Sequence, residues 1–291
     1  MNEEKNISRE LVKGIFLLFV GALMLGGSGI FVKISESSPS LIAFYRSLFA
    51  LPFLYVWMKF EERNNSMDIT WEKKTFFFLV LGGLCFALDM SIWNWSLSFT
   101  SVANATLMAN IAPVFVVIFG ILFLGYKIEI SFVITLLLAL LGVFLVVLPG
   151  EQIMVFGDSL GILAAVFYAG YILSIKDLTN VLQPAKTLFL VTIITTLCLL
   201  PISLMEAESL SLSKSEFFIL ISYAIFSQTF AQGLITSGIA RVSAHLSSLV
   251  LLMQPVAAAF YGWFFLKELL SPMQMAGGLI VLVAIYLASR K

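Results

Sequence analysis

The stretch from Cys85 to Pro113 reads CFALDMSIWNWSLSFTSVANATLMANIAP and decides how the rest of the chain is interpreted. Its composition predicts two apolar helices joined by a few small residues around Thr100. Asp89 falls near the middle of the first helix. A carboxylate at membrane depth costs several kcal/mol, so it usually marks an ion or substrate path and has a partner nearby. The stretch therefore predicts polar chemistry inside a membrane-spanning region.

The composition of the whole chain agrees with a membrane protein. Of 291 residues, 60% are hydrophobic and only 12% are charged, against about 25% charged in a typical soluble domain. The mean hydropathy is +1.02. The formal net charge is zero, which offers no basic surface for nucleic acid. Cys85 and Cys198 both lie in apolar segments and do not form a disulfide framework. We therefore expect a polytopic membrane protein.

Ten segments are long and apolar enough to be spanning helices, which need about 20 residues each. They are Val12–Lys33, Pro39–Trp57, Phe76–Ser98, Val102–Leu124, Ile130–Leu148, Gly157–Ile175, Pro184–Met205, Phe217–Ala240, Ser243–Leu266 and Pro272–Ala288. The first is longer than a signal-peptide core, and no small-residue cleavage site follows it, so we expect it to be retained.

An even number of spans places both termini on one side, and the distribution of positive charge predicts which side. One side collects Lys5, Arg9, Lys13, Lys59, Arg63, Lys73, Lys74, Lys127, Lys176, Lys186, Arg241, Arg290 and Lys291. The other side has Lys33, Lys214 and Lys267. Because cytoplasmic loops carry the excess of lysine and arginine, both termini are predicted to be cytoplasmic.

The chain contains an internal repeat with an offset of 142 residues. The pairs Pro113 and Pro255, Gly120 and Gly262, and Ser101 and Ser243 share this offset, and Lys33 and Lys176 lie one residue off it. The halves, 1–149 and 150–291, each hold five spans, and five is odd, so they are predicted to insert with opposite orientation. Such inverted repeats are common in secondary transporters, whose binding site lies near the midplane. The alternative is chance similarity between apolar segments.

Several motifs carry a resemblance to a known family. They are Gly-Gly-Ser-Gly-Ile-Phe-Val-Lys at 26–33, Ala-Phe-Tyr-Arg-Ser-Leu at 43–48, Ala-Asn-Ile-Ala-Pro at 109–113, Leu-Met-Gln-Pro at 252–255 and Phe-Leu-Lys-Glu at 265–268. With its five-plus-five organisation, the chain resembles the drug/metabolite transporter superfamily in its ten-helix EamA branch. That resemblance implies an all-α integral membrane fold with two inverted five-helix repeats around a central cavity.

The chain departs from this family at one motif. Residues 124–127 read Leu-Gly-Tyr-Lys, where such families often have Leu-Gly-Glu, and the acidic residue is kept only as Glu268.

Asp89, Arg46 and Lys33 are the candidate coupling or gating residues. Helix geometry places Asp89 and Arg46 at similar depths on neighbouring spans, within reach of an arginine side chain. One interpretation is a gate or coupling pair in which Asp89 titrates during transport. The alternative is a permanent ion pair that locks the second and third spans together. Lys33 ends the first span and could instead extend its amine to the lipid headgroups.

Aromatic and amide side chains complete the predicted cavity. The candidate substrate-binding residues are Asp89, Trp93, Asn94, Asn110, Tyr168, Tyr171, Gln228, Gln232 and Gln254. Trp93 is four residues after Asp89 and so shares its helix face, which suits a cationic or zwitterionic substrate. The alternatives are an interfacial tryptophan for Trp93 and interhelical hydrogen bonding for Gln228 and Gln232.

These features predict a secondary transporter of a small polar metabolite that works by alternating access. An amino acid or related zwitterion, exported in exchange for protons or a counter-substrate, is the first hypothesis. An exchanger of organic anions, with Arg46 and Lys33 binding carboxylate, is the second, and a membrane scaffold or enzyme is the alternative of another class. The sequence has no phosphate-binding loop, no metal-ligand cluster and no nucleophile elbow, so no enzyme, cofactor or metal is expected. We expect a monomer or homodimer in the bacterial inner membrane.

Overall fold

The computed structural model describes residues 2–64, 71–100, 102–147, 154–206, 210–267 and 270–290. Ser101, Glu268, most of the loop between the second and third spans, and the boundary between the predicted halves lie outside these ranges. Every regular element in them is a helix, and ten segments are long and apolar enough to cross a membrane. The predicted all-α class with ten spans is therefore confirmed.

The ten spans are built from fifteen helical elements, and we number the spans 1 to 10 in chain order. They are α1 (Asn2–Gly26) with α2 (Ser28–Ile34); α3 (Pro39–Asn64); α4 (Lys73–Phe99); α5 (Val102–Ala109) with α6 (Ala112–Leu124); α7 (Ile130–Val147); α8 (Val155–Leu178); α9 (Pro184–Glu206); α10 (Lys214–Tyr223) with η1 (Ala224–Ala231) and α11 (Gln232–Ile239); α12 (Ala244–Val250) with α13 (Met253–Leu266); and α14 (Pro272–Ser289).

Spans 1, 4, 8 and 9 were predicted as continuous helices, and the structure interrupts all four. In spans 4 and 9 the interruption comes shortly before Pro113 and Pro255, which lack the N–H that would continue the hydrogen-bond ladder. Span 1 bends at Gly27, whose amide bonds to the Met24 carbonyl three residues back. Span 8 contains the π-helical segment η1. These interruptions all fall inside the bundle.

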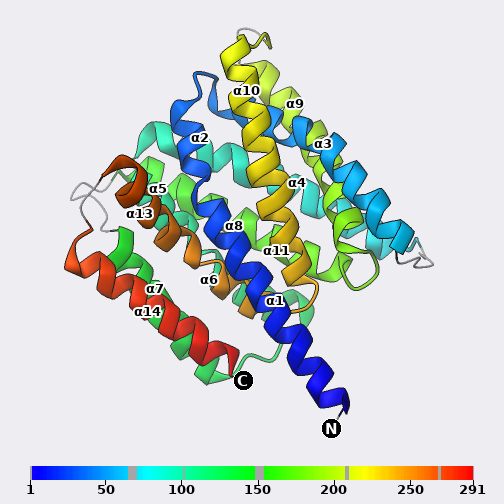
Figure 1. The fold of residues 1–291 in the computed structure, drawn as a ribbon, viewed down its shortest axis with the longest axis vertical. Coiled ribbons are helices and arrows are strands. Elements are labelled where there is room, and N and C mark those ends of the chain that lie inside the picture. Colours follow the sequence, from blue (N-terminus) through cyan, green and yellow to red (C-terminus); the bar gives the residue numbers. More distant parts are fainter. Residues whose placement is uncertain are drawn as a thin grey trace.

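Spans of each half pack against spans of the other half. Span 1 packs against spans 8 and 9, and span 6 packs in the same way against spans 3 and 4. Two further close pairs, α3 with α9 and α7 with α14, each join corresponding spans of the two halves. Both ends of the described chain lie at the same end of the bundle, at the bottom of Figure 1.

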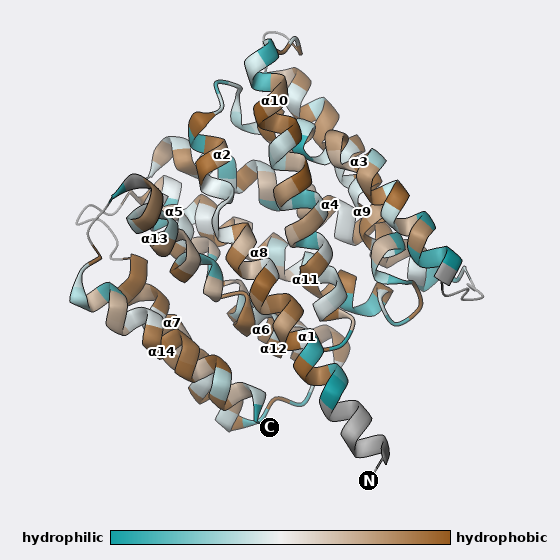
Figure 2. Cartoon of the chain, viewed as in Figure 1, coloured by the Kyte–Doolittle hydropathy of each residue, from teal (hydrophilic) through white to brown (hydrophobic). Residues whose placement is uncertain are grey.

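Small residues allow the closest helix contacts. A Cβ atom added to Gly142 would lie 2.8 Å from the carbonyl oxygen of Gly277, and one added to Gly277 would lie 2.6 Å from that of Gly142. The outside of the bundle is apolar along the middle of the helices, while polar residues gather toward helix ends (Figure 2). Such an apolar outer surface suits contact with lipid.

Candidate substrate cavity

A cavity of about 630 Å³ lies between the two halves of the bundle. Its walls come from α2, α3 and α4 on one side and from α8, α12 and α13 on the other, with the interruption of span 4 between them. Lys33, Leu97 and Gly262 line it close to the ends of their spans, at the end of the bundle opposite the termini. The cavity therefore extends from the middle of the bundle toward that end, and its volume suits a metabolite or drug-sized molecule.

The opposite end of the bundle is tightly packed. Leu18, Ile175 and Ile239 are fully buried there. The Lys176 ammonium donates to the carbonyl oxygens of Ile239 at 3.0 Å and Ala240 at 3.4 Å, which caps the last turn of span 8. This packing separates the cavity from the end that carries the termini.

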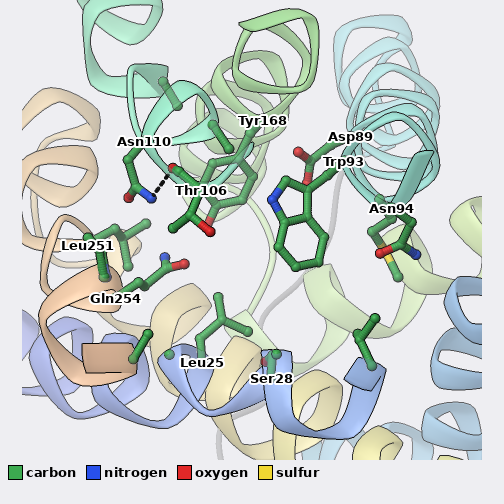
Figure 3. A pocket seen from close by; sticks show the side chains of 18 of the residues that line it. Leu25, Ser28, Asp89, Trp93, Asn94, Thr106, Asn110, Tyr168, Leu251 and Gln254 are labelled. Atoms are coloured by element: carbon green, nitrogen blue, oxygen red, sulfur yellow. Dashed lines mark hydrogen bonds between the residues drawn. The ribbon is translucent and has the colours of Figure 1, made fainter. Parts of the chain in front are cut away.

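One wall of the cavity comes from α4, with Asp89 and Trp93 on the same face (Figure 3). Asp89 is half-buried, and it makes no hydrogen bond or ion pair within the part of the chain that the structure describes. Asn94 also lines the cavity but its side-chain amide donates to the carbonyl of Pro39 at 2.8 Å. Asp89 is therefore the unpaired acid of this wall.

Arg46 of α3 faces the same space and is only 8% exposed. Its guanidinium carbon lies 5.0 Å from the centre of the Tyr223 ring and 5.9 Å from that of Phe86. One terminal nitrogen donates to the Tyr223 hydroxyl at 3.2 Å, while Nε has no partner. Aromatic faces stabilise a cation without neutralising it.

Arg46 and Asp89 interact electrostatically, yet among the described residues no ion pair joins their side chains. The described structure therefore lacks the ion pair that the structural alternative expects between spans 2 and 3. Each charge stays available to a ligand in the space between them.

Amides and a phenol form the other wall of the cavity. Asn110 lies at the interruption of span 4 and donates to the Thr106 carbonyl at 2.8 Å. Gln254 approaches the Tyr168 side chain from α13 (Figure 3). The Tyr168 hydroxyl is buried without a hydrogen-bond partner at bonding distance, as is the side-chain oxygen of Gln232. These unpaired polar atoms can serve a polar ligand.

Two of the predicted substrate-binding residues do not line the cavity. Tyr171 is fully buried and stacks on Phe86, with ring centres 4.2 Å apart. Gln228 is also fully buried, and its amide donates to the Thr192 hydroxyl at 3.2 Å. Both side chains pack behind the cavity wall. For Gln228 this agrees with the alternative of interhelical hydrogen bonding. Lys33 stands at the mouth of the cavity, where it is exposed.

Several cavity residues were not singled out from the sequence. Ser28, Thr106 and Ser248 contribute hydroxyl groups, and Phe86 and Tyr223 hold the guanidinium of Arg46. The Gly-Gly-Ser-Gly run at 26–29 was a usable signal for Ser28, because small residues mark close backbone approach. For the others the sequence carries no distinguishing pattern. The described residues hold no group of three metal-ligating side chains.

Known proteins place this architecture among transporters. The pseudopaline exporter CntI of Pseudomonas aeruginosa is 24% identical over 286 residues, which cover 96% of this chain and 97% of that protein. An uncharacterized transporter of Archaeoglobus fulgidus is 26% identical over 285 residues and 94% of this chain.

The fold is similar to that of a solved crystal structure, with a TM-score of 0.77 and 15% sequence identity. The matched region covers 94% of this chain and 96% of that one. At this identity the likeness supports the fold alone. A model of the EamA-like transporter family matches residues 12–148 and matches again over residues 155–290. The chain therefore belongs to the EamA-like transporter family.

Proposed function

We propose that this protein is a secondary active transporter of a small zwitterionic metabolite that exports its substrate in exchange for protons. The observation that carries the proposal is the central cavity, in which an acid and an arginine, without an ion pair among the described residues, face one space between the halves. In many transporters the site lies between repeats, at interrupted helices near the midplane. The exporter among the relatives supports the outward direction.

A zwitterion matches the two charges of the cavity. Its ammonium group would bind Asp89 beside the Trp93 ring, and its carboxylate would bind Arg46 through charge-assisted hydrogen bonds. A proton on Asp89 would compete with the ammonium group, because both neutralise the same carboxylate. Competition at a single site is the simplest way to couple export of the substrate to import of a proton.

A second candidate is the exchange of organic anions. It is favoured by Arg46, which has no ion-pair partner among the described residues, and by Lys33 at the mouth. Both cations could bind the carboxylates of a dianion. In this alternative Asp89 would repel the substrate, so its neutralisation would strengthen binding rather than weaken it.

A thermal-shift screen of the purified protein separates the two candidates. The panel holds amino acids, organic acids, nucleotides and cationic drugs, tested on the native protein and on Asp89→Asn, Arg46→Gln and Glu36→Gln. Glu36 is the matched control, because its side chain lies outside the cavity and makes no hydrogen bond in the described structure. Zwitterions should stabilise the native protein and the control but neither cavity variant. Stabilisation of Asp89→Asn by dianions would favour the second candidate, and ligand shifts that survive both cavity substitutions would contradict a cavity site.

Both candidates use two inverted repeats, with halves 1–149 and 150–291 and both termini in the cytoplasm. The reciprocal packing of span 1 on spans 8 and 9 and of span 6 on spans 3 and 4 supports the repeat, and the lysine and arginine bias supports the orientation. We place the protein in the bacterial inner membrane as a monomer or homodimer. A cysteine introduced at Asn65 should resist an impermeant thiol reagent added outside intact cells, and its modification there would reverse the topology.

A further inference from the structure

The short helix α2 contributes to the wall of the cavity, and the three residues that follow it donate hydrogen bonds to one buried carboxylate. Glu216, in the first turn of α10, is only 5% exposed. It accepts a hydrogen bond from the Ser35 hydroxyl, and it also accepts from the backbone amides of Glu36 at 3.2 Å and Ser37 at 3.3 Å. One side chain of span 8 thus binds the three residues that follow α2.

Three further contacts join α2 to span 8. The Ser28 and Ser227 hydroxyls lie 2.7 Å apart. The Phe31 ring stacks on Tyr223 with centres 5.3 Å apart and contacts Phe226 at 5.7 Å. These contacts run along α2 from Ser28 to Phe31 and join it to the end of α10 and the start of η1.

Both partners are interrupted at the same level of the bundle. Span 1 bends at Gly27, directly before Ser28, and span 8 becomes π-helical from Ala224 to Ala231, which includes Ser227. Hinges commonly lie at short interruptions that absorb the change in backbone angles. Below this level, α1 packs on α11. Span 1 therefore contacts span 8 both above and below its interruption.

A corresponding contact exists at the opposite end of the bundle. The Lys74 ammonium, in the first turn of α4, forms an ion pair at 2.7 Å with Asp177 near the end of α8. Glu216 follows Lys74 by the repeat offset of 142 residues (216 − 74). In the lysine register of 143 residues, Asp177 is equivalent to Ile34, which directly precedes Ser35 (177 − 143). Both contacts join the end of one span to the start of another. Glu216 is buried in the first contact, whereas Lys74 is largely exposed in the second.

We propose that Glu216 is a positioning residue of the transport site, which ties α2 to α10 so that the two half-helices move as one gate arm over the cavity. The proposal rests on the proposed function, because a gate has meaning only for a transporter. The arm turns about Gly27 and the π-helical segment, and its movement toward α4 and α13 narrows the mouth between Lys33 and Leu97. The equivalent Lys74–Asp177 contact ties span 6 to span 3 at the other face.

Electron paramagnetic resonance of paired spin labels tests the arm without any substrate. Labels at Ile34 and Phe218 report on the α2–α10 pair, and labels at Ile34 and Phe99 report across the mouth. All three positions are exposed, and the two native cysteines are replaced by serine. In the native background the first pair should give one narrow distance distribution. Glu216→Ala should at least double its width and broaden the second distribution as well.

Glu36→Ala is the control, because it removes a neighbouring carboxylate that does not hold α2, and it should leave both distributions unchanged. Glu216→Gln keeps one acceptor oxygen and should broaden the first distribution less than Glu216→Ala, which keeps the test usable if the alanine variant does not fold. A distribution that stays narrow in Glu216→Ala, or in Glu216→Gln where only that variant folds, would overturn the proposal. Absent transport with an intact, Glu216-dependent arm would instead count against the proposed function alone.

Discussion

The two halves of the bundle pack alike but differ at the positions that face the cavity. In the first half, span 3 is one continuous helix that carries Asp89, whereas the equivalent residue of span 8 is Ala231, at the end of a π-helical segment. Span 1 bends at Gly27, whereas span 6 runs straight through Gly170, which is equivalent in the lysine register. The shared packing builds the cavity, and the differences give it one acidic and one amide-lined wall.

The shared packing of the two halves and their different cavity residues have separate consequences for transport. Exchange of the two equivalent conformations of an inverted repeat is a simple route to alternating access. A chemically symmetric cavity, however, could not distinguish the ends of a zwitterion. If the substrate is a zwitterion, as proposed, the acid on span 3 without a counterpart on span 8 would orient it within the cavity.

The largest expected effect comes from removing the acid that breaks the symmetry. Asp89→Asn should abolish proton-driven transport in proteoliposomes, because the variant can bind neither a proton nor the ammonium group of the substrate at this position. Because Asp89 has no ion-pair partner in the described structure, the variant should fold, with a loss well below the 3–5 kcal/mol expected for a broken buried ion pair. Glu36→Gln, which removes a carboxylate outside the cavity, should transport normally. Full proton-coupled transport by Asp89→Asn would remove the residue from the coupling mechanism.

The next largest effect concerns the cation on the same side as Asp89. Arg46→Gln should weaken binding of carboxylate-bearing ligands by about 10- to 100-fold, since a hydrogen bond to a charged group contributes about 1.5–3 kcal/mol. Binding of amines without a carboxylate should change little. Isothermal titration calorimetry measures both, with Lys214→Gln as a control that removes a cation outside the cavity lining. Equal losses for both ligand classes would indicate that Arg46 only maintains the fold.

A smaller effect tests the bend of span 1. A Cβ atom on Gly26 would lie 2.6 Å from the Gln254 carbonyl oxygen and 2.7 Å from the Ala257 Cβ. Gly26→Ala should therefore push α1 away from α13 and cost about 1–3 kcal/mol, as overpacking does. At Gly29 a Cβ atom meets nothing within 4 Å, so Gly29→Ala is the matched control and should keep the native melting temperature. Equal melting temperatures for the two variants would show that the close contact of Gly26 with α13 does not limit the packing there.

The smallest effect is expected at the exposed member of the equivalent contacts. Lys74 is 63% exposed in its ion pair with Asp177, and exposed pairs contribute about 0.2–1 kcal/mol. Lys74→Ala should lower the melting temperature less than Glu216→Ala does, because Glu216 is buried and accepts three hydrogen bonds. The opposite order of the two melting temperatures would contradict this ranking.

Much of the fold could be predicted because spanning helices are set by apolar length. The segment predicted at Pro184–Met205 is observed at Pro184–Glu206, and that at Pro272–Ala288 is observed at Pro272–Ser289. The interruptions could not be predicted, because proline is tolerated inside spanning helices and Pro113 alone does not indicate a break. The π-helical segment Ala224–Ala231 has no sequence signature either.

The candidate site was predictable only where straight helix geometry holds. Asp89 and Trp93 were expected to share a face of span 3, and they do. Gln228 and Gln232 were paired by the same spacing, but the wider π turn at Gln228 rotates it away from the face of Gln232. Tyr168 and Tyr171 are three residues apart, and the stacking of Tyr171 on Phe86, which no local pattern encodes, decides which of them reaches the cavity.

The cavity between the halves should be open to water from the side opposite the termini, and cysteine labelling tests this most directly. In a variant without the native cysteines, Thr106→Cys in the cavity wall should react with an impermeant maleimide added on that side of oriented vesicles. Leu122→Cys, on the lipid-facing surface of the same span, is 68% exposed in the bundle but should not react. Reaction of Thr106→Cys only from the side of the termini, or no reaction from either side, would contradict the account.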